Sequence, residues 1–90
     1  MSTHKPIISI VMATHNRRSM VERTLSQLDY CGLDRADYET IVVDNDSSDG
    51  TPAAIAHRVN RLICLPRNAG STAKAFGAEE TRGQYLVFLD

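Results

Sequence analysis

Four short polar segments follow the apolar runs of this sequence, and they contain most of the side chains that could do chemistry. The segments are residues 14–17 (Thr-His-Asn-Arg), 44–46 (Asp-Asn-Asp), 67–70 (Arg-Asn-Ala-Gly) and Asp90. Carboxylates there can hold a divalent cation that neutralises phosphate oxygens, or they can accept hydrogen bonds from a ribose hydroxyl or a base N–H. Arg17, Arg67 and Lys74 could supply cations for phosphate. A nucleotide with a metal-bound diphosphate would use all of these residue types.

The apolar pattern predicts four strands that alternate with three helices. Nearly continuous β-branched runs are typical of strands covered on both faces, and a 3.6-residue period is typical of helices. The expected strands are residues 7–13, 40–43, 62–65 and 85–89, and the expected helices are about 17–31, 51–59 and 71–82. Strands that alternate with helices imply right-handed crossovers. We therefore predict an α/β fold, β-α-β-α-β-α-β, with a parallel sheet and helices on both faces.

The predicted fold places the four polar segments along one edge of the sheet, because ligands of open parallel sheets bind beyond the carboxyl ends of the strands. No G-x-G-x-x-G follows the first strand, and no G-x-x-x-x-G-K-[ST] occurs, so a classical dinucleotide site and a P-loop are disfavoured. A calcium-binding loop starting at Asp44 is rejected, since Asp49 and Ile55 stand where that loop needs Gly and Glu.

Composition limits the class of protein. The 90 residues carry a net charge of −1, which leaves no basic excess for a nucleic-acid partner. Cys31 and Cys64 are too few for a disulfide scaffold or a zinc cluster, and we expect both to be buried or half-buried thiols. The longest apolar run, residues 7–13, is too short to cross a bilayer. The cytoplasm is therefore the expected location.

We expect residues 1–6 to be a flexible leader and residues 7–90 to be an incomplete domain. The sequence stops directly after an apolar strand, where natural domains seldom end, so we expect a longer protein. Open sheet edges would then favour self-association. Several side chains have ordinary expected roles: Phe76, Leu25 and Leu28 in the core, His15 in a loop or pocket wall, and Asp46 and Asp49 in shaping their loop.

Four blocks of the sequence resemble the opening of family 2 glycosyltransferases, which have the GT-A fold and use nucleotide sugars. The blocks are residues 8–17 (ISIVMATHNR), 41–51 (IVVDNDSSDGT), 67–70 (RNAG) and 86–90 (LVFLD), of which the second is the most specific. The resemblance implies a Rossmann-like N-terminal half of a GT-A fold. It also implies metal-assisted, inverting transfer of a sugar from a UDP-, dTDP- or GDP-linked donor to a sugar or lipid-linked acceptor. The full-length enzyme would be cytoplasmic or peripheral at the membrane.

The resemblance also implies roles for individual residues. Asp44 would accept a hydrogen bond from the base, commonly uracil or thymine. Asp90 would be the first carboxylate of a D-x-D motif, which binds ribose and, with its partner, Mg²⁺ or Mn²⁺. The residues expected to bind the nucleotide sugar are Thr14, Asn16, Arg17, Asp44, Asn68, Gly70, Lys74 and Asp90. We expect no catalytic residue within the chain and no transfer activity from it alone.

Two other classes of protein fit part of the pattern. Residues 44–48 imitate the D-x-D-x-[TV] motif of haloacid-dehalogenase-like phosphatases, with Asp44 as nucleophile and Asp46 as acid/base, although Ser48 departs from that motif. A receiver-like signalling module would need an acidic pair after the first strand, where Thr-His stands instead.

Overall fold

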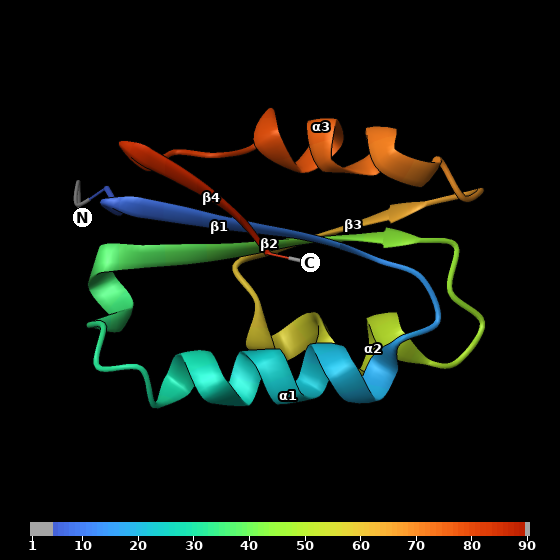
Figure 1. Ribbon diagram of the computed structural model, residues 1–90, viewed down its shortest axis with the longest axis horizontal. Helices are drawn as coiled ribbons and strands as arrows, with labels where there is room; N and C mark the ends of the chain where they lie inside the picture. Colours follow the sequence, from blue (N-terminus) through green and yellow to red (C-terminus); the bar gives the residue numbers. More distant parts are fainter. Residues whose placement is uncertain (1–4, 90) are drawn as a thin grey trace.

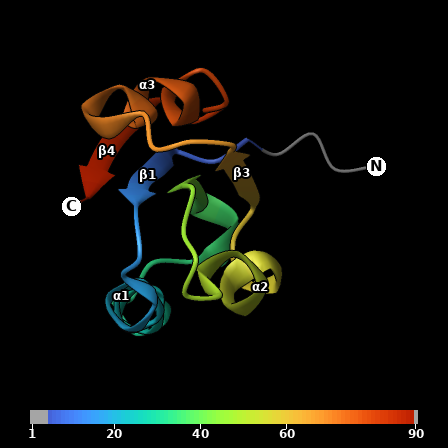
Figure 2. The ribbon, with the colours of Figure 1, turned by 90° about the vertical axis from the view of Figure 1, so that its right-hand side faces the viewer.

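The four strands form one parallel sheet in the computed structural model, which describes residues 5–89 (Figures 1 and 2). They are β1 (Ile8–Thr14), β2 (Tyr38–Asn45), β3 (Arg61–Leu65) and β4 (Tyr85–Leu89). The order across the sheet is β3-β2-β1-β4, and every pairing is parallel. The predicted α/β fold is confirmed. Most of the expected leader, residues 1–4, lies outside the described residues, as does Asp90.

Helices cover both faces of the sheet, as predicted (Figure 2). The helices α1 (Arg18–Asp29) and α2 (Thr51–Ile55) lie on one face and α3 (Ala73–Ala78) lies on the other. Short 3₁₀ turns complete the chain: η1 (Arg35–Asp37), η2 (Ala56–Arg58) and η3 (Gly70–Thr72). Between residues 5 and 89, no helix has the length and apolar composition needed to cross a bilayer.

An aliphatic core fills the space between the sheet and the α1/α2 layer. Met12 of β1 and Val42 of β2 pack there against Val21 and Leu25 of α1 and against Ile55 of α2. All five side chains are at most 5% exposed. Burying one such side chain stabilises a fold by roughly 1.5–3 kcal/mol. This core therefore fixes the start of α1 beside the carboxyl ends of the two central strands.

Helix α3 packs against the other face through its smallest residue. A Cβ atom at Gly77 would lie 2.6 Å from Cγ1 of Val11 and 3.0 Å from Cγ2 of Val43. The missing side chain therefore lets α3 lie directly on β1 and β2. Phe76 is 45% exposed, so its expected place in the core is wrong. The helix also ends at Ala78, before the predicted residue 82.

The two outer strands account for the remaining corrections. β4 has one neighbouring strand, and the side chains from Tyr85 to Phe88 are 40–64% exposed, so the burial predicted from its apolar sequence is wrong. Cys31 and Cys64 are both exposed, against expectation. Cys64 lies on the other edge strand, β3, and Cys31 follows the end of α1. An apolar run indicates a strand, but its exposure depends on what packs against it.

A buried polar contact ties the entry of β4 to the centre of the sheet. The Ser9 hydroxyl donates to Oε2 of Glu39 at 2.6 Å, and the same oxygen accepts from the backbone N–H of Arg82 at 2.6 Å. The N–H of Gly83 donates to Oγ of Ser9 at 2.8 Å. Because the Glu39 carboxylate is nearly enclosed, these bonds compensate for its burial.

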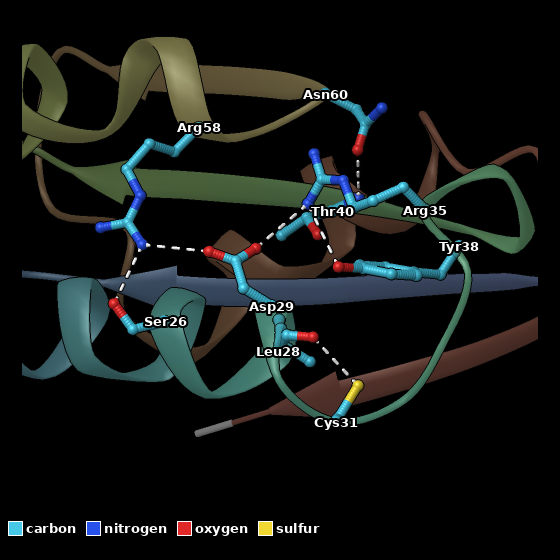
Figure 3. Close-up of polar contacts among 9 residues, drawn as sticks. All are labelled: Ser26, Leu28, Asp29, Cys31, Arg35, Tyr38, Thr40, Arg58 and Asn60. Atoms are coloured by element: carbon cyan, nitrogen blue, oxygen red, sulfur yellow. Dashed lines mark hydrogen bonds and ion pairs between the residues drawn. The ribbon is translucent and has the colours of Figure 1, made fainter.

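A second polar cluster lies at the opposite edge of the sheet from the strand carboxyl ends (Figure 3). Asp29, at the end of α1, pairs with Arg35 and Arg58 at 3.7 Å each. Arg58 also donates to the Ser26 hydroxyl, and Arg35 donates to the Tyr38 hydroxyl. These partly exposed pairs contribute at most about 1 kcal/mol each. They link α1 to η1 and η2, the turns that precede β2 and β3.

Close packing at Gly77 leads to a test. We expect Gly77→Ala to lower the free energy of unfolding by about 1–3 kcal/mol, the usual cost of extra volume in a packed layer, although alanine has the higher helix propensity. Val11→Ala removes the methyl group that the new Cβ would meet. The double variant should therefore lose less stability than the sum of the two single losses in urea denaturation. Additive losses would contradict this account.

Candidate functional site

The carboxyl ends of β1 and β2 bring two buried polar side chains together. Thr14 and Asp44 are partners in the parallel register, and they are 6% and 2% exposed. Oδ2 of Asp44 accepts a hydrogen bond from the Ser47 N–H at 3.0 Å. Within the described part of the chain, Oδ1 of Asp44 and Oγ1 of Thr14 have no hydrogen-bond partner. A buried polar atom without a partner costs roughly 1–3 kcal/mol, and such atoms are uncommon in folded proteins; Oγ1 of Thr40, near the other end of β2, is a third one.

A depression of about 490 Å³ opens at the same edge of the sheet. It is lined by Ala13, Thr14, His15, Arg17, Asn45, Gly70, Ser71 and Lys74. Its size falls within the ~300–1,000 Å³ that is typical of small-molecule sites. Arg17 follows β1 and Lys74 lies on α3, so cationic groups reach it from two elements, and none of its lining residues is acidic. The depression is therefore suited to an anion.

The predicted binding residues fall into three groups. Thr14, Arg17, Gly70 and Lys74 line the depression. Asp44 is buried beside Thr14 and does not line it. Asn16 lines a second hollow of about 480 Å³ that it shares with Arg17 and Asp49. The exposed Asn68 accepts from the Gly70 N–H at 2.8 Å, so its side chain shapes the turn.

The loop after β1 is held by the loop after β2. The N–H of Asn16 donates to Oγ of Ser47 at 2.9 Å, and the Ser48 N–H donates to Oδ1 of Asn16 at 2.7 Å. Asn16 and Asp46 both have positive φ angles, 51° and 56°, which Asn and Asp tolerate better than most residues. The two loops therefore form one hydrogen-bonded unit.

Asp49 shapes this unit as predicted, and it also caps a helix. Its carboxylate accepts from the Arg18 N–H at 3.0 Å and from the Thr51 N–H at 3.1 Å. The N-capping position of α1 is Arg17, which makes no side-chain cap bond of its own. The hydroxyl of Thr51 is the main cause that holds the pKa of Asp49 below its ordinary value; desolvation opposes it, and the Arg18 and Thr51 N–H groups add smaller effects that lower the pKa.

Sequence reasoning missed three lining residues: Ala13, Asn45 and Ser71. Asn45 directly follows Asp44 at the end of a strand, so its position could have identified it as a lining residue. His15 contributes to the wall of the depression. Cys64 is the partner of Asp44 on β3, where partial burial and the charge of Asp44 raise the pKa of its thiol.

Comparison with known proteins identifies the family. The profile described as Glycosyl transferase family 2 matches residues 9–90. The chain belongs to this family. It is 30% identical over 99 residues to the putative teichuronic acid biosynthesis glycosyltransferase TuaG of Bacillus subtilis, covering 100% of the chain and 37% of that protein. It is also 30% identical over 95 residues to validoxylamine A glucosyltransferase of Streptomyces hygroscopicus, covering 99% of the chain and 22% of that protein.

Solved structures of glycosyltransferases share the fold of this family 2 chain. The mannosyltransferase PcManGT from Pyrobaculum calidifontis, in complex with GDP-Man and Mn²⁺, superposes with a TM-score of 0.69 at 24% identity over 84% of the chain and 24% of that protein. Staphylococcus aureus TarS in complex with UDP-GlcNAc gives a TM-score of 0.81 at 21% identity over 92% of the chain and 26% of that protein. The chain thus spans about a quarter of these structures and at most 37% of the two curated relatives.

Membership of family 2 argues against the two alternative classes, a haloacid-dehalogenase-like phosphatase and a receiver-like signalling module. A haloacid-dehalogenase-like phosphatase needs Asp44 as an open nucleophile, but this residue is 2% exposed. A receiver-like module needs acidic residues after β1, where Thr14 and His15 stand. The Asp44 loop belongs to the segment that the glycosyltransferase profile matches.

The expected Mg²⁺ or Mn²⁺ has no ligand set in residues 5–89. No group of three or more His, Cys, Asp or Glu side chains comes together there. The expected ligand, Asp90, lies outside the described residues.

The low pKa of Asp49 leads to a second test. Asp49→Asn keeps the shape but removes the charge, and we expect a lower melting temperature at pH 7. A carboxyl group with a depressed folded-state pKa stabilises the fold above its unfolded pKa and loses that effect as the pH falls through the folded value. The difference from the parent protein should therefore shrink on acidification to about pH 3, close to the ordinary carboxyl range.

Asp46→Asn is the matched control for this test. Asp46 lies in the same loop, is exposed, and makes no hydrogen bond or ion pair with the other described residues. Its variant should melt like the parent protein at both pH values. An equal effect of the two substitutions would contradict the capping role of Asp49.

Proposed function

We propose that the depression binds the nucleoside diphosphate of a nucleotide-sugar donor for a glycosyltransferase reaction. One observation carries this proposal: the buried Asp44 has an unpartnered oxygen beside the Thr14 hydroxyl, at the edge of a hollow with two cationic side chains. Membership of family 2 supports the class of donor. The complexes of PcManGT with GDP-Man and of TarS with UDP-GlcNAc provide further support from proteins of the same fold.

The pairing of a carboxylate with a hydroxyl suits one kind of base edge. Oδ1 of Asp44 would accept from a ring N–H, and Oγ1 of Thr14 would donate to the neighbouring ring carbonyl. Uracil, thymine and guanine each carry an N–H next to a C=O, whereas adenine and cytosine do not. Both protein oxygens are closed to solvent, so binding would include a local opening of this edge. We therefore assign UDP, dTDP or GDP as the nucleotide class.

Arg17 and Lys74 would bind the diphosphate from two sides. The Arg17 guanidinium can form paired hydrogen bonds with phosphate oxygens, while the Lys74 ammonium acts as a compact point charge. The positive potential would also favour encounter with an anionic ligand. Asn16, Asn68 and Gly70 would act in this proposal by shaping the loops around the nucleotide.

The proposal also covers the metal ion, the stereochemistry of transfer and the acceptor. Asp90 would contact the ribose and ligate Mg²⁺ or Mn²⁺, an assignment supported by the Mn²⁺ in the PcManGT complex. Transfer would be inverting, with a sugar or lipid-linked hydroxyl as acceptor. In this proposal the chain alone binds the donor but does not transfer the sugar. None of its residues is assigned as the general base that would take the proton of the acceptor hydroxyl.

Isothermal titration calorimetry in Mn²⁺ tests the nucleotide assignment. We expect UDP, dTDP or GDP to bind measurably better than ADP and CDP. Asp44→Asn should weaken binding of the preferred nucleotide by about 10-fold or more, because a hydrogen bond to a charged group contributes about 1.5–3 kcal/mol.

Asp34→Asn is the control, since Asp34 accepts from the Ala36 N–H in an exposed turn before β2 and lies outside the depression. It should leave the affinity unchanged. Failure of the parent protein to bind any of the three nucleotides would refute the proposed function. Equal affinity of the parent and Asp44→Asn proteins would remove Asp44 from the binding site.

A further inference from the structure

Asn45 makes a two-point contact with a turn that follows the neighbouring strand. It is the last residue of β2, is 6% exposed, and pairs in register with Leu65 at the end of β3. Its Oδ1 accepts from the Ala69 N–H at 2.9 Å, and its Nδ2 donates to the Gly70 carbonyl at 3.3 Å. Both ends of the side-chain amide are therefore used on one backbone segment.

The main chain of Asn45 is bonded to the loop on its other side. Its carbonyl lies 2.5 Å from Nδ1 of His15, and a carbonyl can only accept, so the proton of this bond lies on Nδ1. Nε2 of His15 then accepts from Nδ2 of Asn16 at 3.3 Å. Asn45 thus connects the loop after β1 with the turn after β3.

These two segments both line the 490 Å³ depression, and they follow the strands on either side of β2. His15 and Arg17 come from the loop after β1, and Gly70 opens η3, which leads directly into α3 and Lys74. Asn45 itself lines the hollow between them. Ala73 is buried and Gly77 packs on β1 and β2, so the position of Lys74 relative to Arg17 depends on the packing of α3 together with the turn that Asn45 holds.

Little else from outside holds this turn. Its other hydrogen bonds within the described chain are local: Gly70 N–H to Asn68 Oδ1, the Thr72 hydroxyl and N–H to the Ala69 carbonyl, and Ala73 N–H to the Gly70 carbonyl. Asn68, Gly70, Ser71 and Thr72 are all exposed, so apolar burial contributes little to their order. Gly70 also has a φ of +60°. Because glycine has no Cβ, the backbone of this turn can adopt other conformations when no side chain holds it.

We propose that Asn45 is a positioning residue for nucleotide binding: its side-chain amide fixes the Ala69–Gly70 turn, and so sets the wall that carries Lys74 before the ligand arrives. This rests on the proposed function of the depression. A wall that is already ordered spares the ligand the entropic cost of ordering it. Asn45 needs no contact with the nucleotide for this role.

Asn45→Asp removes the amide donor at constant shape, but it also adds a negative charge to the lining of the depression. Hydrogen exchange is therefore measured without ligand, and the neutral Asn45→Ser variant is measured beside it. The carboxylate can still accept from the Ala69 N–H, but an oxygen replaces the donor that faces the Gly70 carbonyl. We expect the affinity for UDP in Mn²⁺, or for whichever nucleotide the parent binds best, to fall about 10-fold by calorimetry, equal to ~1.4 kcal/mol. Amide hydrogen exchange at Ala69 and Gly70 should become faster. Asn45→Ser provides a second variant if Asn45→Asp does not fold.

Asn60→Asp is the matched control, since Oδ1 of Asn60 likewise accepts a backbone N–H, that of Thr40, at 2.8 Å (Figure 3). This contact lies at the far edge of the sheet, and the new carboxylate can still accept the Thr40 N–H, so the substitution should leave both the affinity and the exchange at Ala69 unchanged. Parent-like affinity or parent-like exchange in the Asn45 variants would overturn the inference while leaving nucleotide binding intact. Absence of nucleotide binding by the parent protein would instead refute the proposed function on which the inference rests.

Discussion

The parallel register of β1 and β2 is the constraint on which the rest of this structure depends. It sets Thr14 opposite Asp44 at the carboxyl edge and Ser9 opposite Glu39 near the other end. A shift of one residue in either strand would turn its side chains to the opposite face. Val42 would then leave the α1/α2 core, and Asp44 would no longer lie beside Thr14. The packing of the core and the chemistry of the edge are therefore fixed by the same pairing.

Side-chain hydrogen bonds to the backbone replace apolar packing at the candidate site. Asn16, Asp49 and Asn45 each accept from the N–H groups of a loop distant in the sequence. Exposed loops cannot bury enough apolar surface to order themselves, whereas short polar side chains supply directional contacts that leave the ligand face open. The site is thus ordered by a polar framework attached to an aliphatic sheet.

The sequence was sufficient for the order and type of the elements, because apolar runs and turn residues act locally. The four strands lie within one or two residues of their predicted ranges. The exposure of Phe76, Cys64 and β4 could not be obtained in this way, since it depends on which strands occupy the edges of the sheet. The helix α3 ends at Ala78, before the predicted residue 82, and the Arg82 N–H bonds instead to the distant Glu39.

The candidate site was likewise predicted where the signal is local and missed where it depends on distant contacts. Charged residues at strand ends, such as Arg17 and Asp44, are visible from position and chemistry. Asn45 carries no charge, and its role comes from contacts with residues 69 and 70 that no local pattern encodes. Asp49 was assigned to its own loop correctly, but its bond to Arg18 crosses to another element.

The strand order β3-β2-β1-β4 has a consequence for how the chain folds. The inner strand β1 pairs on one side with β2, its successor along the chain, and on the other side with β4, the last strand of the described sequence. Such a pairing has a high contact order, because a long loop must close before its hydrogen bonds form. The carboxyl edge, built from the ends of β1, β2 and β3, needs shorter loops to close. The β1–β4 pairing is thus the one in this sheet that must close the longest stretch of chain.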